Sequence, residues 1–157
     1  SRGLGDVYKR QTVIKDLQTQ EQSCVEKYER YSKLAKDQVL IDLFTDLHGK
    51  EQKHLESLTQ MLSGKVPSCD CNDRDGKDYN PAATYSMAPS EDKKTDCFLA
   101  TDCIGTEKLV SIRKCLHSVI RVSENFWLTF RSKNRTMRRC FINIKQSTAW
   151  RSPEFRL

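Results

Sequence analysis

The sequence lacks the features that would place it in a membrane or mark it for export. Among its 157 residues no apolar run approaches the roughly 20 residues needed to cross a bilayer, and no secretory signal opens the chain. We therefore expect a soluble protein that is made in the cytoplasm and has no membrane partner. The length allows one domain with a sizeable core.

Acidic residues are scarce in the last part of the chain. The formal net charge is +6, yet residues 112–157 carry eleven Lys or Arg against two Asp or Glu, a balance of +9. Subtracting +9 from +6 leaves −3 for residues 1–111. A basic tail that also contains Trp127 would suggest a nucleic-acid partner, but the abrupt change of charge indicates that the two parts differ in origin.

A change of reading frame explains this tail. If each true codon takes the third base of one written codon and the first two bases of the next, synonymous codons for residues 124–150 can encode KLLADIQVEEQNHAEMFYKYKTVNSM. That string has a helical pattern, whereas the written one has no sustained period. The EQNH in the restored string is similar to EQKH at residues 51–54. We therefore interpret residues 112–157 as an out-of-frame tail, and we expect no nucleic-acid partner.

The first eleven residues carry no fold information in our interpretation. The segment 1–11, SRGLGDVYKRQ, matches the translation of a transposon-type sequencing adapter, in which GAT GTG TAT AAG AGA CAG encodes residues 6–11. Segments of technical origin are excluded from fold reasoning. The expected domain is therefore residues 12–111.

Two amphipathic helices are predicted at the start of this domain. The first, residues 12–35, has one apolar stripe that is interrupted by Glu21. The second runs over residues 38–62 behind a capping Asp37, and Gly64 ends it. Its stripe is interrupted by Glu51 and His54. The apolar positions are Ile14, Leu17, Cys24, Tyr28, Tyr31 and Ala35 in the first helix, and Leu40, Leu43, Phe44, Leu47, Leu58 and Met61 in the second.

A third helix is predicted from about Phe98 past Ser111, with Glu107 among its apolar residues. It follows a polar connection, residues 65–97, which is unusually long for a compact domain. Two helices, a long crossover and two more helices form the ferritin-like variant of the four-helix bundle. We therefore expect an all-α, ferritin-like four-helix bundle whose fourth helix was destroyed by the frameshift.

The interrupted stripes predict a metal site. Burying an unpaired carboxylate is costly, so a glutamate on an apolar stripe needs an exposed edge, a partner or a metal ion. Counted from the turn near residue 36, Glu21 and Glu51 lie at a similar height of roughly 22 Å on adjacent helices, with His54 one turn further on. Glu21, Glu51, His54 and Glu107, together with the frame-restored Glu-x-x-His, match the ligands of two-metal carboxylate bundles. Such ligands suit Fe or Mn.

The chain resembles the rubrerythrin-like branch of the ferritin-like superfamily, and within it the small ferritin-like spore coat proteins of spore-forming anaerobic bacteria. The matching stretches are QEQSCVEKYERYSKLAKD, KEQKHLESL, SGKVPSCDCN, DCFLATDCIGTEKLVS and the restored EEQNHAEM. The resemblance implies two Fe or Mn ions in the intact protein, at most a partial site here, and the metal ligands Glu21, Glu51, His54 and Glu107. It also implies a spore-coat location, with other coat proteins or further copies of the chain as partners.

Two functions follow from this resemblance. One is a di-metal oxidoreductase with peroxidase-like activity in the intact protein, inactive as written. The other is a purely structural spore-coat bundle. No Cys-x-x-Cys pair is present, so the rubredoxin module of true rubrerythrins is missing, which argues against an internal electron donor.

The remaining candidates are thiols and a histidine. Cys24 and Cys103 are predicted to be buried core residues, and His48 is predicted to face solvent. Three cysteines lie in or beside the connection, where metal binding, cross-linking and plain unpaired thiols all remain open: Cys69, Cys71 and Cys97.

The frameshift is directly testable in the coding DNA. We expect independent sequencing of the gene to place an inserted or deleted base soon after the codon for Ser111, with the EEQNHAEM frame beyond it. A continuous frame that encodes the written tail would contradict this interpretation.

Overall fold

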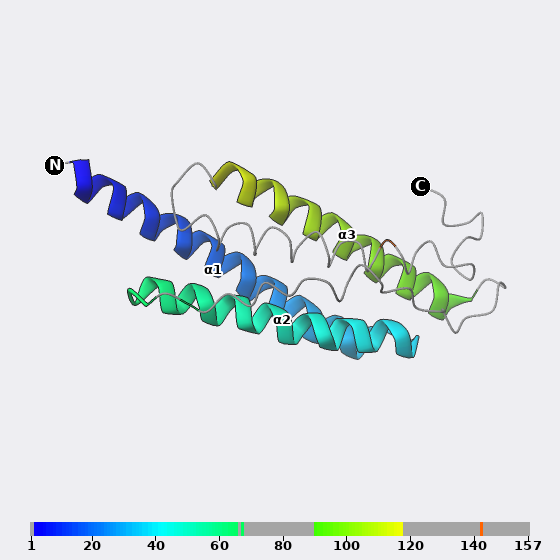
Figure 1. The fold of residues 1–157 in the computed structure, drawn as a ribbon. Coiled ribbons are helices and arrows are strands. Elements are labelled where there is room, and N and C mark those ends of the chain that lie inside the picture. The colour runs from blue at the N-terminus through cyan, green and yellow to red at the C-terminus, as the bar shows by residue number, and fades with distance from the viewer. Residues whose placement is uncertain (1, 66, 68–89, 118–141, 143–157) are drawn as a thin grey trace.

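The computed structural model describes residues 2–65, 67, 90–117 and 142. Within these ranges the chain is all-helical and contains no strand: α1 is Arg2–Leu34, α2 is Gln38–Leu62 and α3 is Glu91–His117 (Figure 1). The prediction of an all-α protein is confirmed. Most of the predicted connection, including Cys69 and Cys71, and almost all of the tail lie outside the described residues.

Helix α1 begins ten residues before the predicted start at Thr12. The first proline of the chain is Pro67, so no residue at the N-terminal side interrupts the helical backbone. In the added stretch the side chains of Leu4 and Tyr8 are exposed, and the buried stripe begins only at Val13. The early residues therefore extend the helix without adding to the core.

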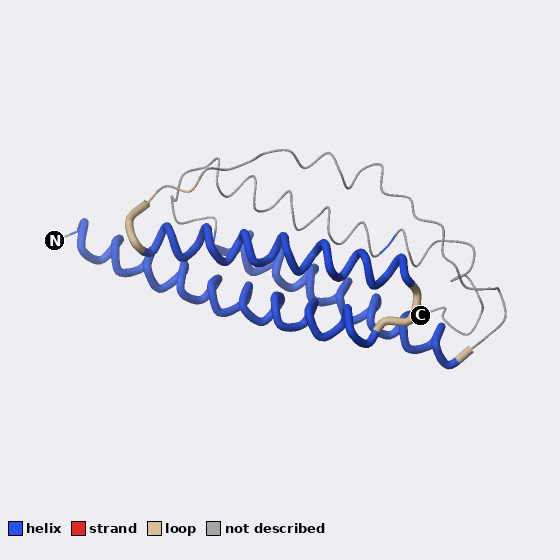
Figure 2. The backbone as a smooth tube through the Cα atoms, turned by 90° about the horizontal axis from the view of Figure 1, so that it is seen from below, coloured by secondary structure: helices blue, strands red, loops and turns tan. Residues whose placement is uncertain are grey.

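The hairpin of α1 and α2 has the turn that the sequence predicts. Asp37 has an extended backbone, and its Oδ1 accepts the N–H of Val39 at 2.8 Å, which caps α2. Gly64 adopts a φ of +79°, the left-handed conformation that glycine tolerates after a helix. The two helices then lie side by side along most of their length (Figures 1 and 2).

The buried apolar side chains form two separate clusters. The turn cluster lies toward the α1–α2 turn and includes α3, whereas the end cluster lies at the opposite end of the hairpin. The turn cluster contains Cys24, Tyr28, Tyr31, Ala35, Leu40, Leu43, Phe44, Leu47, Cys97, Leu99, Ala100 and Cys103. The end cluster contains Val13, Ile14, Leu17 and Leu58. Burying each large apolar side chain contributes about 1.5–3 kcal/mol, so these clusters hold the hairpin closed.

Helix α3 begins seven residues earlier than the predicted start at Phe98. The Oγ of Ser90 accepts the N–H of Lys93 at 3.1 Å, and Glu91 and Asp92 place negative charge in the first turn. Both features stabilise a helix N-terminus. The apolar pattern alone did not reveal this start, because the first turns of α3 are polar.

Contacts along α1 fix the direction of α3. Asp96 contacts the backbone of the turn after α1, and Asp102 contacts Tyr31, whereas Glu107 contacts Tyr28 further back along α1. Helix α3 is therefore antiparallel to α1 and runs in the same direction as α2 (Figure 1). The end of α2 and the start of α3 therefore lie at opposite ends of the helices (Figure 1).

Substitution of Phe44 tests whether the turn cluster stabilises the fold. Its ring is fully buried against Tyr28 and Tyr31, with ring centroids 6.1 and 5.7 Å away. We expect Phe44→Ala to lower the free energy of unfolding by about 3–5 kcal/mol, through lost burial and a residual cavity. Phe98→Ala is the matched control, since Phe98 is 68% exposed, and should change stability by less than about 0.5 kcal/mol. Equal losses in urea titrations of both variants would contradict the described core.

Candidate metal centre

The interrupted stripes of α1 and α2 meet in a buried polar layer. Glu21 follows Leu17 by one turn on α1, and Glu51 and His54 lie between Leu47 and Leu58 on α2. The exposed fractions of the three polar residues are 0%, 1% and 5%. This layer, which we call the Glu-Glu-His cluster, lies between the turn cluster and the end cluster.

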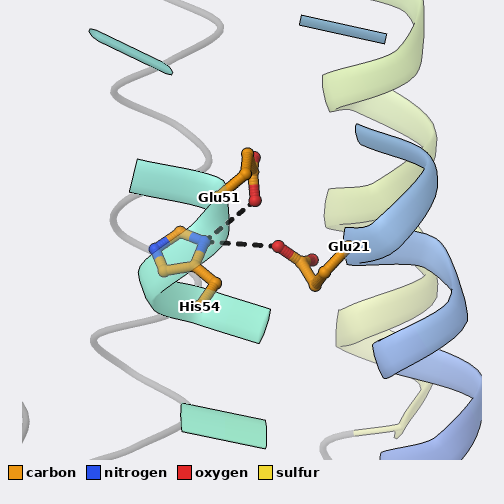
Figure 3. Close-up of side chains that lie close together, drawn as sticks. All are labelled: Glu21, Glu51 and His54. Atoms are coloured by element: carbon orange, nitrogen blue, oxygen red, sulfur yellow. Dashed lines mark hydrogen bonds and ion pairs between the residues drawn. The ribbon is translucent and has the colours of Figure 1, made fainter. Parts of the chain in front are cut away.

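The three side chains point toward one another across the helix pair (Figure 3). The Nδ1 of His54 lies 3.1 Å from Oε2 of Glu51 and 3.3 Å from Oε2 of Glu21. One potential ligand atom from each residue lies within 4.8 Å of the other two. The predicted proximity of these three residues is confirmed, because their equal heights on adjacent helices bring them together.

The charge of the Glu-Glu-His cluster favours a divalent cation. When both are ionised, the carboxylates of Glu21 and Glu51 bring two negative charges into a buried layer, where uncompensated charge is costly. A protonated imidazole would offset only one of these charges, whereas a divalent ion would offset both. Two carboxylate oxygens and an imidazole nitrogen also suit Fe or Mn, and they provide none of the thiolates of structural zinc sites. The residues therefore fit a metal ion.

Glu107, the fourth predicted ligand, has a different partner. It is fully buried on α3, and its Oε1 accepts a hydrogen bond from the hydroxyl of Tyr28. It does not belong to the set of ligand atoms that lie within 4.8 Å of one another. The structure thus brings three of the four predicted residues together, and the role of Glu107 as a ligand remains a prediction.

The role of Tyr28 as a hydrogen-bond donor was not predicted from the sequence. As one aromatic position in an apolar stripe, it gave no sign that its hydroxyl would bind a carboxylate. Burial raises the pKa of this phenol well above its usual value, and the negative charges of Glu107 and Glu51 raise it further. The hydroxyl therefore remains protonated at neutral pH and holds Glu107 in place.

A second polar group, partly exposed, joins α1 to α3. Asp102 Oδ2 accepts hydrogen bonds from Tyr31 at 2.7 Å and from Lys27 at 2.9 Å, and Lys27 also donates to Thr106 at 2.7 Å. Burial acts to raise the pKa of Asp102, but the hydrogen bonds from Tyr31 and Lys27 outweigh it and the net shift is downward. Sequence periodicity did not identify this group, because pairing across helices leaves no periodic signal.

The structure contradicts the prediction for His48 and confirms the predictions for Cys24 and Cys103. The prediction that His48 faces solvent is wrong: its side chain is half-buried, and its Nδ1 lies 3.0 Å from the carbonyl oxygen of Val25, because α1 packs against that face of α2. Cys24 and Cys103 are buried as predicted. Cys97 lies within α3 and is also buried, and burial raises the pKa of Cys103.

The chain matches no protein-family model, no curated protein and no solved structure. Among the described helices, none combines the length and apolar character that a bilayer crossing requires.

The pairing of Tyr31 with Asp102 predicts a shifted titration. Burial, the hydrogen bond to Asp102 and the charge of Asp102 raise the pKa of Tyr31 to about 12. Because this pKa lies above the unfolded value near 10, the stabilisation from this phenol is complete below about pH 10 and is lost as the pH rises toward 12. In Asp102→Asn the pKa of Tyr31 should fall, since the negative charge of Asp102 is lost, while the effects of burial, Cys103 and Arg30 remain. Tyrosinate absorbance, with the Tyr31→Phe titration subtracted, measures this, and an unchanged pKa would exclude the described pairing.

Proposed function

We propose that this chain is a ferritin-like metal-binding protein in which the Glu-Glu-His cluster holds one divalent Fe or Mn ion. The observation that carries the proposal is the convergence of Glu21, Glu51 and His54 in a buried layer with ligand atoms within 4.8 Å. Two features support the ferritin-like assignment: the antiparallel pair α1–α2, and a third helix that runs parallel to α2 and carries a buried glutamate.

The intact protein would bind a second ion. Glu107 from α3 and the Glu-x-x-His of the frame-restored fourth helix would complete the ligand set of a two-metal carboxylate bundle. Bound Fe or Mn would supply redox chemistry toward peroxide or oxygen. Within this chain, Glu21, Glu51 and His54 would bind the ion, Tyr28 orients Glu107, and the two apolar clusters exclude water from the layer between them. Assembly into a spore coat is part of the proposal through the sequence resemblance alone.

Metal titration tests the binding site. We expect the full chain to bind about one Mn²⁺ ion, with low affinity because part of the ligand set is missing. Glu51→Gln keeps the side-chain shape but removes the charge, and it should weaken binding by about 100-fold or more, since losing even a hydrogen-bond partner of a ligand costs about 10–100-fold. Glu56→Gln is the matched control, because Glu56 is exposed on the same helix. Equal Mn²⁺ affinities for the two variants would reject the site.

The metal-free chain gives a second, independent test. His54→Ala removes the imidazole and leaves the two carboxylates in the buried layer. We therefore expect the free energy of unfolding to fall by about 3–5 kcal/mol. Glu51→Gln retains one carboxylate and the imidazole, so it should leave stability unchanged or raise it. Urea unfolding in the presence of a chelator measures both variants. A larger loss in Glu51→Gln than in His54→Ala would contradict the charge balance described above.

A further inference from the structure

Asp96 on α3 is bound to the turn between α1 and α2 by both of its oxygens. Its Oδ1 accepts the backbone N–H of Lys36 at 2.8 Å, and its Oδ2 accepts that of Asp37 at 2.7 Å. The carboxylate is fully buried. Hydrogen bonds to an ionised acceptor are about twice as strong as neutral ones, and two from consecutive N–H groups fix the orientation of the carboxylate.

The apolar contacts of α3 specify its position poorly. Of its four buried residues in the turn cluster, Leu99 is large and the other three are small: Cys97, Ala100 and Cys103. Small side chains interdigitate little, so hydrophobic burial alone allows several registers of similar energy. Polar pairs, in contrast, are satisfied in one register, and unsatisfied buried polar groups are costly.

The spacing of Asp96 and Glu107 makes the register matter. They are eleven residues apart, about three helical turns or roughly 16 Å, so both lie on the same face of α3. Asp96 contacts the turn after α1, and Glu107 contacts Tyr28 on α1. A slip of one residue would move Glu107 by about 1.5 Å along α3 and turn it by about 100°, away from Tyr28.

We propose that Asp96 is a positioning residue, which sets the register of α3 on the α1–α2 hairpin and so places Glu107 beside Tyr28 at the edge of the metal site. The part of this inference that concerns metal affinity rests on the proposed function. The register itself does not, because the contacts of Asp96 and Glu107 involve protein groups only.

The hydroxyl proton of Tyr28 reports the register without metal. Its hydrogen bond to a buried carboxylate should give a slowly exchanging, downfield proton resonance, which Tyr28→Phe identifies by its loss. Asp96→Asn replaces one acceptor oxygen with an NH₂ group that opposes a backbone N–H, and we expect this resonance to disappear. Asp92→Asn, at an exposed carboxylate one turn earlier on α3, should retain it. Retention of the resonance in Asp96→Asn overturns the proposal.

Mn²⁺ titration of the same variants tests the link to the site. In the frame-restored protein, where Glu107 would be a metal ligand, we expect Asp96→Asn to bind Mn²⁺ about tenfold more weakly than Asp92→Asn, as is typical when the support of a ligand is lost. Equal affinities in that protein overturn the link between Asp96 and the metal site. If neither the variants nor the parent chain binds Mn²⁺, the proposed function fails. The Tyr28 resonance then still tests whether Asp96 sets the register of α3.

If Asp96→Asn loses its helical circular dichroism, hydrogen exchange at the backbone amides of the unmodified chain tests the proposal instead. In the unmodified chain the N–H groups of Lys36 and Asp37 should exchange slowly although they lie in a turn, because a buried carboxylate accepts both. Exchange at the rate of a solvent-exposed turn overturns the proposal.

Discussion

Two glutamates and one histidine share a buried layer between α1 and α2, and the cost of burying their charge constrains the rest of the helix pair. Glu21 and Glu51 occupy positions that an ordinary bundle would fill with leucine, so the core is divided into the turn cluster and the end cluster. A divalent ion would offset the charge of two ionised carboxylates more fully than a protonated imidazole. An ion that binds only the folded chain would therefore stabilise it.

The third helix relates to this layer through polar contacts more than through apolar ones. Asp96, Asp102 and Glu107 bind successive points along the turn and α1. Since the facing apolar residues of α3 are mostly small, these contacts determine its position. The parallel course of α2 and α3 also explains why a long connection follows Gly64: a short turn can join only antiparallel neighbours.

The sequence predicted the parts of this structure that depend on periodicity within one helix. The stripes of α1 and α2, the bounds of α2, its Asp37 cap and the convergence of Glu21, Glu51 and His54 all follow from spacing along a helix. Contacts between helices were not predictable in this way. The acceptor role of Asp96, the donor role of Tyr28 and the partial burial of His48 each depend on which groups the neighbouring segment presents. The early start of α3 was missed because the cap at Ser90 precedes polar turns with no apolar stripe.

The division of the core has a consequence for how the hairpin opens. Among the described residues, four buried side chains make up the end cluster, whereas the turn cluster has twelve and also includes residues of α3. Local opening follows the smallest loss of buried contacts, so the end of the hairpin can separate while the turn cluster stays intact. Such a partial opening would uncover the carboxylates of Glu21 and Glu51 from one side. An ion could then reach the layer without global unfolding, and closing of the end cluster would set how slowly it leaves.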